Sequence, residues 1–203
     1  MIKKAPKWII GIDEVGRGPI AGPVTVCVFI SDIKFDTKSV FPNQTIRDSK
    51  KTIKTIRNSI NQSIRYLRKS KIVKIDWVIA SKSAEYIDTH GIVKSIDKCI
   101  NKCIKTLKKR NYPVHKAKIY LDGSLSLKNG LFDQETLIKG DEKIGHIAIA
   151  SILAKVNRDN LMTKLDTDYP FYGWNTNMGY GTKMHYKAIK KYGISQLHRI
   201  SFL

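Results

Sequence analysis

Several features that define other classes of protein are scarce or missing in this 203-residue sequence. No uninterrupted apolar run approaches the roughly 20 residues that a membrane helix needs. The basic start, MIKKAPKWII, breaks at Gly11 and runs into Asp13 and Glu14, which argues against a signal peptide. Repeats, low-complexity tracts and Gly/Ser linkers are also missing. With 42% hydrophobic and 9% aromatic residues, we expect a soluble globular chain without membrane contact rather than a disordered one.

Cysteine is rare, and its positions form no metal or disulfide pattern. Cys27, Cys99 and Cys103 are an odd number and include no CxxC pair. Cys99 and Cys103 are one helical turn apart and have the character of small core residues. A disulfide or a zinc site is therefore not expected, and a reducing, cytoplasmic location is.

Acidic residues are also few, at 17 against 37 lysines and arginines, so the formal net charge is +20 and the pI is about 9.9. A surface of this kind attracts polyanions, of which nucleic acid is the commonest. The alternatives are an acidic protein partner or an anionic lipid surface. On so basic a chain, acidic residues that stand close together in the sequence require a functional or structural reason.

Strand-like and helix-like segments alternate along the chain, which predicts an α/β or mixed α+β fold. We expect one domain over residues 1–203, including a helical C-terminal segment from about 166 to 203. Apolar positions at steps of three and four predict the helices, of which 92–110 carries many lysines. Its outer face either extends a nucleic-acid surface or is simply solvated. The expected strands are 7–13, 24–30, 73–81, 117–124 and 135–141, and the expected helices are 52–69, 92–110, 145–165 and a last one ending at Gly193.

Four carboxylates attract attention because of where they fall. Asp13 and Glu14 follow an apolar strand and precede a glycine-rich turn, and Asp122 follows another strand. Carboxyl ends of neighbouring strands are where α/β proteins place their sites. Asp159 lies on the face of a helix shared with Lys155. Each has a simpler explanation: a solvated turn or helix cap for the first two, an Asp-Gly turn for Asp122, and an exposed ion pair with Lys155 or Arg158 for Asp159.

Several carboxylates in one place repel one another unless a cation lies among them. Oxygen ligands without a His or Cys cluster favour Mg²⁺ or Mn²⁺ over zinc, and the five histidines show no ligand spacing. Two such ions about 4 Å apart form the arrangement that cleaves phosphodiesters. Asp141 is better suited to capping a helix or supporting the site. For His185 we expect packing or a phosphate contact.

Six motifs extend almost from one end of the chain to the other. They are GIDEVGRGPIAGPV at 11–24, DSKK at 48–51, LDGS at 121–124, GD at 140–141, IAIASILAKVNRD at 147–159 and GYGTKMHYKAIKKYGISQLHRISF at 179–202. Together and in this order they are highly specific, and they resemble ribonuclease HII, the type 2 ribonuclease H.

The resemblance implies an RNase H-like mixed sheet flanked by helices, with a helical C-terminal part. It implies metal-dependent endonucleolytic cleavage of the RNA strand in RNA/DNA hybrids. It also implies nicking 5′ of a single ribonucleotide in duplex DNA, which leaves 3′-hydroxyl and 5′-phosphate ends and serves ribonucleotide excision repair. The implied cofactors are two Mg²⁺ or Mn²⁺ ions. The implied partners are the hybrid and the ribonucleotide-containing duplex, with a monomer that needs no other subunit.

By motif position, the carboxylates that hold the metal ions and catalyse cleavage are Asp13, Glu14, Asp122 and Asp159. The turn that reads the ribose 2′-hydroxyl through its backbone is Gly-Arg-Gly. Tyr180 falls on the tyrosine that packs against the sugar at the RNA–DNA junction, and Lys50 and Lys183 on phosphate-binding lysines. The implied residues are thus Asp13, Glu14, Asp122, Asp159, Gly16, Arg17, Gly18, Lys50, Tyr180 and Lys183.

Departures from the family pattern are small: Ser124 stands where asparagine is frequent and Asn157 where threonine is usual. The sister type, ribonuclease HIII, lacks the Gly-Arg-Gly turn. Three rival functions remain to be weighed. A transposase-like or resolvase-like nuclease would cut duplexes made only of DNA. A protein that merely binds hybrids would bind better without its acids. A basic ribosomal protein would not explain why acids follow buried strands.

Overall fold

The computed structural model describes residues 7–40, 53–127 and 132–203. Five strands form one mixed sheet in the order β3-β2-β1-β4-β5. β2 is antiparallel to both β1 and β3, whereas β4 is parallel to β1 and β5 is parallel to β4. The expected mixed α/β fold is confirmed. The strands are β1 (Trp8–Val15), β2 (Val24–Asp32), β3 (Ile75–Lys82), β4 (Ala117–Asp122) and β5 (Asp133–Leu137).

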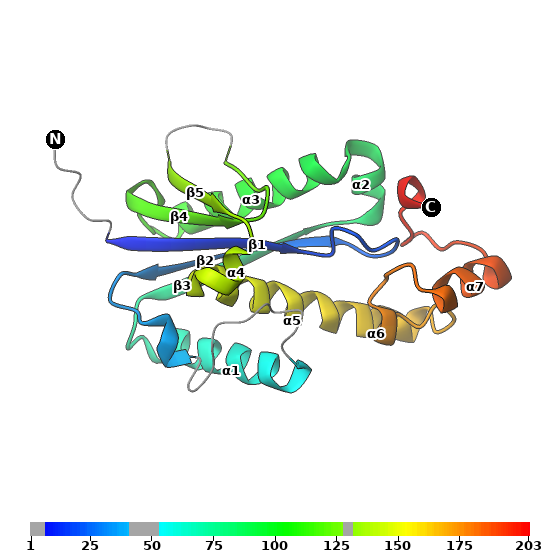
Figure 1. The fold of residues 1–203 in the computed structure, drawn as a ribbon, viewed down its shortest axis with the longest axis horizontal. Coiled ribbons are helices and arrows are strands. Elements are labelled where there is room, and N and C mark those ends of the chain that lie inside the picture. Colours follow the sequence, from blue (N-terminus) through cyan, green and yellow to red (C-terminus); the bar gives the residue numbers. More distant parts are fainter. Residues whose placement is uncertain (1–6, 41–52, 128–131) are drawn as a thin grey trace.

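Helices cover both faces of the sheet (Figure 1). The longer ones are α1 (Lys54–Ser70), α2 (Ala84–His90), α3 (Ile92–Lys109), α5 (Gly145–Asp168) and α7 (Lys183–Tyr192). The short ones are η1 (Thr37–Val40), η2 (Val114–Lys116), α4 (Gly140–Lys143), α6 (Trp174–Asn177) and η3 (Ile200–Phe202). Among the residues described, no helix is both long and apolar enough to cross a membrane.

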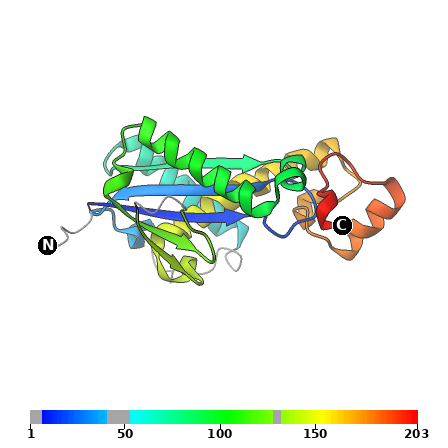
Figure 2. The same ribbon diagram turned by 90° about the horizontal axis from the view of Figure 1, so that it is seen from above.

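Three apolar clusters hold these layers together. One lies between the sheet and α3, and a second lies between the sheet, α5 and α1. The third is small and aromatic, and it packs the second half of α5 against α6 and α7 (Figure 2). The three cysteines are free and buried, and they pack in the two sheet clusters as small core residues.

The helix α5 lies unusually close to the sheet. Its first ten residues, 145–154, are all buried, because the helix is enclosed by the sheet on one side and α1 on the other. A Cβ added to Gly11 would lie 2.2 Å from the backbone of His146, so only glycine allows this approach. The close contact brings the polar residues of α5 beside the carboxyl end of β1.

One sequence-based prediction needs correction, and one helix was not predicted. The strand predicted at 135–141 is β5, which ends at Leu137, and α4 follows from Gly140. Lys139 takes a left-handed conformation with φ 53°, which ends the extended chain there. The helix α2 was not predicted. Its signals were present in the sequence, since Ser83 caps its first turn by accepting a hydrogen bond from the Tyr86 N–H, and Gly91 ends it with φ 80°.

Candidate active site

Three of the four predicted carboxylates lie where β1 and β4 stop pairing. The parallel ladder ends with Ile12 opposite Leu121, so Asp13 and Asp122 come next on neighbouring strands. The strand predicted at 7–13 extends to Val15 as β1, and the glycine-rich turn begins at Gly16, with φ +84°. Beyond Ile12, β1 keeps its pairing with β2, whereas its pairing with β4 has ended.

Asp13 is the most buried member of this group, with 5% of its surface exposed. Burial raises its pKa well above the usual value, and the neighbouring charges of Glu14 and Asp122 raise it further. Hydrogen bonds with the Ser151 side chain of α5 and with the Glu14 N–H, at 2.7 Å, act in the opposite direction. The protein thus holds an acid where its charged form is unfavourable without a cation.

Glu14 and Asp122 lie nearer to solvent. Burial raises the pKa of Glu14, whereas Arg17, 3.4 Å away, lowers it, and Asp122 raises it again. One Asp122 oxygen accepts a hydrogen bond of 2.6 Å from the Gly140 N–H at the start of α4. A side chain at Gly140 would press on that same oxygen and on Ile147. The GD motif therefore supports Asp122 through the backbone of its glycine, while Asp141 follows in the first turn of α4.

The structure places Asp159 in ion pairs with two cations. Lys155 Nζ lies 2.8 Å from Asp159 Oδ1, and an Arg57 nitrogen lies 3.7 Å from Oδ2. The pair with Lys155 was one of our alternatives, but the side chain is buried, not exposed. Within the described part of the chain, no group of three Asp, Glu, His or Cys side chains is already arranged to hold a metal ion.

The Gly-Arg-Gly turn, Gly16–Gly18, follows Asp13 and Glu14 after one intervening residue, Val15. Gly16 has φ +84°, and a Cβ there would lie 2.3 Å from Arg158 Nε, so both conformation and space require glycine. The Arg17 side chain is 45% exposed and reaches toward Glu14 and the hydroxyl of Ser124, each at 3.4 Å. The turn therefore presents backbone groups and one partly exposed cation beside the carboxylates.

Two fully buried arginines brace this turn, and sequence reasoning missed both. Arg199, in the C-terminal tail, donates hydrogen bonds to the carbonyls of Gly16 (2.7 Å), Arg17 (3.0 Å) and Gly22 (2.9 Å). Arg158, in α5, donates to three other backbone carbonyls nearby, those of Pro23 (2.9 Å), Met178 (2.8 Å) and Ala21 (3.2 Å). Burial, and then the charge of Arg158, lowers the pKa of Arg199 to about 9, which leaves it charged at neutral pH.

Tyr180 reaches the same place from the far end of the chain. Its ring lies 3.9 Å from the position of a Cβ on Gly18, and 42% of the residue is exposed. The carbonyl of Gly179 accepts hydrogen bonds from the Ile20 and Ala21 N–H groups, which ties the two loops together. Lys183 is exposed at the start of α7. Lys50 lies outside the described residues.

His185 supports the loop that carries Tyr180, a role that the sequence did not predict. The ring is buried, as the packing alternative predicted. One nitrogen lies 2.9 Å from the Tyr180 carbonyl, and the other accepts from the Trp174 indole at 3.1 Å. His198 completes the network at 3.1 Å. Burial lowers the pKa of His185, so it is a neutral support and not a phosphate-binding cation.

Comparison with known proteins identifies the family. The family model for ribonuclease HII matches residues 10–203. The chain is 41% identical over 197 residues to ribonuclease HII of Clostridioides difficile (strain 630), covering 97% of this chain and 70% of that one. It is 37% identical over 198 residues to ribonuclease HII of Pelagibacter ubique, covering 97% and 96%.

Solved structures share the fold. Ribonuclease H2 from Pyrococcus horikoshii superposes with a TM-score of 0.72 at 24% identity, covering 96% of this chain and 93% of that one. Bst-RNase HIII, solved in complex with Mn²⁺, gives 0.71 at 17% identity, covering 98% and 68%. The chain therefore belongs to the ribonuclease HII family of hydrolases, which act on RNA phosphodiester bonds in RNA/DNA hybrids.

Proposed function

We propose that this enzyme cuts the RNA strand of hybrids and also nicks duplex DNA 5′ of a single embedded ribonucleotide. The products would carry 3′-hydroxyl and 5′-phosphate ends. The observation that carries the proposal is the position of the Gly16–Gly18 turn, one residue beyond Asp13 and Glu14 on the chain and beside Tyr180. The acids therefore lie next to a backbone surface that could contact one ribose.

Divalent metal ions fit the acids of this site. The donors are all carboxylate oxygens, and burial, together with the charges of Glu14 and Asp122, raises the pKa of Asp13, so a bound cation would favour its charged form. Asp13, Glu14, Asp122 and Asp159 would hold two Mg²⁺ or Mn²⁺ ions, and the Mn²⁺ complex of the related HIII enzyme supports this. When bound, such ions supply a water nucleophile and stabilise the leaving 3′-oxygen.

The chain itself supplies orientation and selectivity. Ser151 and the Glu14 N–H fix the Asp13 carboxylate, and the Gly140 N–H fixes Asp122. Backbone groups of Gly16, Arg17 and Gly18 would contact the 2′-hydroxyl, the group by which RNA differs from DNA. Tyr180 would pack against the sugar on the DNA side of the junction. Lys183 would pair with a phosphate, a role that we also assign to Lys50.

The direct test is cleavage of a labelled DNA duplex that contains one ribonucleotide, with Mg²⁺, Mn²⁺ or EDTA. We expect a metal-dependent nick 5′ of the ribonucleotide and none in an all-DNA duplex. Cutting of a long RNA/DNA hybrid without that nick would overturn the roles of Gly16–Gly18 and Tyr180. Cutting of the all-DNA duplex would favour a nuclease of the transposase kind.

A further inference from the structure

A basic groove adjoins α3, the helix that covers the face of the sheet opposite α5 (Figure 1). It has a volume of about 640 Å³ and lies between α3 and the carboxyl end of β3. No carboxylate is among the residues that line it, although Ser81, Asn101 and Thr106 add neutral polar groups. Five lysines line it: Lys82, Lys98, Lys102, Lys105 and Lys109.

Four of these lysines form a stripe along one face of α3. Their spacing of four, three and four residues places them one above another over about 16 Å of helix. Like charges at this spacing repel one another. In the described part of the molecule, none of the five lysines has an ion-pair partner, and only Lys82 has a ring contact, 3.8 Å above Tyr86. The groove is therefore an uncompensated positive surface.

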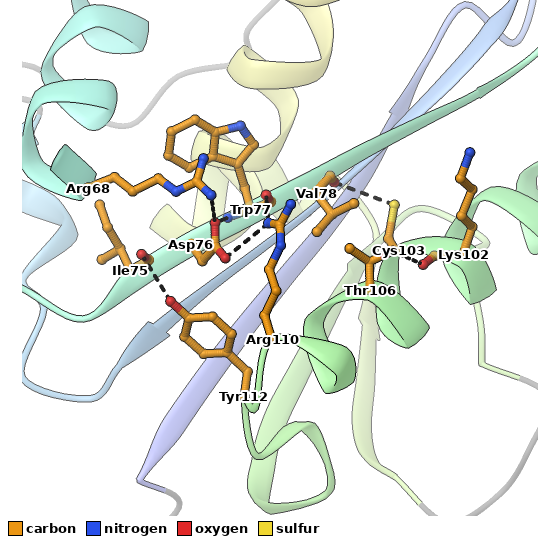
Figure 3. Close-up of polar contacts among 10 residues, drawn as sticks. All are labelled: Arg68, Ile75, Asp76, Trp77, Val78, Lys102, Cys103, Thr106, Arg110 and Tyr112. Carbon is orange, nitrogen blue, oxygen red and sulfur yellow. Dashed lines mark hydrogen bonds and ion pairs between the residues drawn. The ribbon is translucent and has the colours of Figure 1, made fainter.

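The helix that carries the stripe is fixed to the sheet. Cys103 Sγ donates a hydrogen bond to the Val78 carbonyl at 3.4 Å, and Arg110 bridges Asp76 (3.0 Å) and the Trp77 carbonyl (3.2 Å) (Figure 3). The lysines thus project from a rigid base, which keeps their spacing constant.

The groove begins at the same end of the sheet as the active site. β3 and β1 run in the same direction because both are antiparallel to β2. Val15 pairs with Thr25, and Thr25 pairs with Ser81, whose hydroxyl lies 2.8 Å from that of Thr25. Two strand spacings therefore separate the end of β1 from the groove, which is about 10 Å, or three base pairs of duplex.

We propose that this groove binds the sugar-phosphate backbone of the substrate duplex on one side of the cut. The proposal rests on the proposed function, because it places the cut at Asp13 and Glu14. A stripe of 16 Å matches about five consecutive phosphates of one strand, at 3.4 Å of rise each. Lysine suits this role because its point charge pairs with phosphate without reading a base.

The test uses two 24-bp DNA duplexes, each with one ribonucleotide three base pairs from one end or from the other. They have equal length and charge, but only one can extend into the groove. We compare the wild type with Lys98→Gln/Lys102→Gln. A control with the same loss of charge, Lys69→Gln/Lys74→Gln, alters exposed lysines at the opposite end of the sheet. The readouts are kcat/KM at 50 and 200 mM salt and Kd in EDTA.

On the duplex that reaches the groove, the wild type should lose about tenfold more kcat/KM between the two salt concentrations than the groove variant, because two phosphate contacts are missing. On the other duplex, and for the control variant, salt should act as in the wild type. Equal effects on both duplexes, or equal effects of the two variants, would overturn the proposal. A wild type that cuts neither duplex would refute the proposed function alone, and the Kd values would then decide about the groove.

Discussion

Asp13 and Asp76 are almost equally buried, with 5% and 3% of their surface exposed, on strands two positions apart in the sheet. Their surroundings are opposite. Asp76 lies between Arg68 at 2.8 Å and Arg110 at 3.0 Å and accepts the Trp77 N–H (Figure 3). Asp13 has two carboxylates as its charged neighbours.

From this difference we infer separate roles for the two aspartates. A buried charge is tolerated when it is paired and hydrogen-bonded, which is the case for Asp76 and ties α1, β3 and the end of α3 together. Asp13 is hydrogen-bonded, but burial and then the charges of Glu14 and Asp122 raise its pKa, and no cation among the described residues offsets them, so its charged form destabilises the fold. Such local cost concentrates at functional sites. We therefore expect Asp76 to stabilise the fold, and we propose that Asp13 serves the reaction instead.

The largest effect should come from Asp13→Asn. The amide keeps the shape but loses the charge that a divalent ion requires, so we expect cleavage to fall by roughly a thousandfold or more. Duplex binding in EDTA should persist or strengthen, because one negative charge near the phosphates is gone. Cleavage at the wild-type rate would show that the site lies elsewhere.

Asp76→Asn should do the reverse. It leaves two arginines without their carboxylate, and we expect a loss of about 2 kcal/mol in the free energy of unfolding. This is less than for a fully buried pair because Arg68 and Arg110 are 40% and 42% exposed. Urea unfolding measures it. The kcat of the folded variant should be unchanged. A large drop in kcat would contradict the inference that Asp76 acts on stability alone.

Arg199→Lys extends the contrast to buried cations. Lysine cannot reproduce the three hydrogen bonds that the guanidinium donates to the Gly-Arg-Gly turn and Gly22. We expect kcat/KM at a single ribonucleotide to fall about tenfold, and more than kcat/KM on a long hybrid. A merely structural role would lower both by the same factor, which makes their ratio the decisive readout.

A smaller effect appears in the pH dependence of stability without metal. Burial raises the pKa of Asp13 in the folded protein, so the folded state binds more protons than the unfolded one above the unfolded pKa. Wild-type stability should therefore fall as pH rises from about 4 toward the raised pKa, by at most about 1.4 kcal/mol per pH unit. Urea unfolding of Asp13→Asn should lack this component. Parallel profiles for the two proteins would contradict it.

The sequence was sufficient for the elements with clear periodicity and for the family. It predicted the strands around the acids because apolar runs end at Asp13 and Asp122, and α3 because its apolar stripe repeats. It missed Arg158 and Arg199 because basic residues are usually exposed, and nothing local marks one that will meet carbonyls distant in sequence. It also missed α2, where a short helix offers only its caps as signals.

Thermal unfolding of the wild type and Asp13→Asn, each titrated with Mn²⁺ or Mg²⁺, tests most directly whether the uncompensated acids serve a cation. Binding to the folded state alone raises the unfolding temperature. We predict that the ions stabilise the wild type and that Asp13→Asn loses most of this shift, while Asp76→Asn, though less stable, keeps it. Equal shifts in the wild type and Asp13→Asn would contradict the assignment of Asp13 to the metal site.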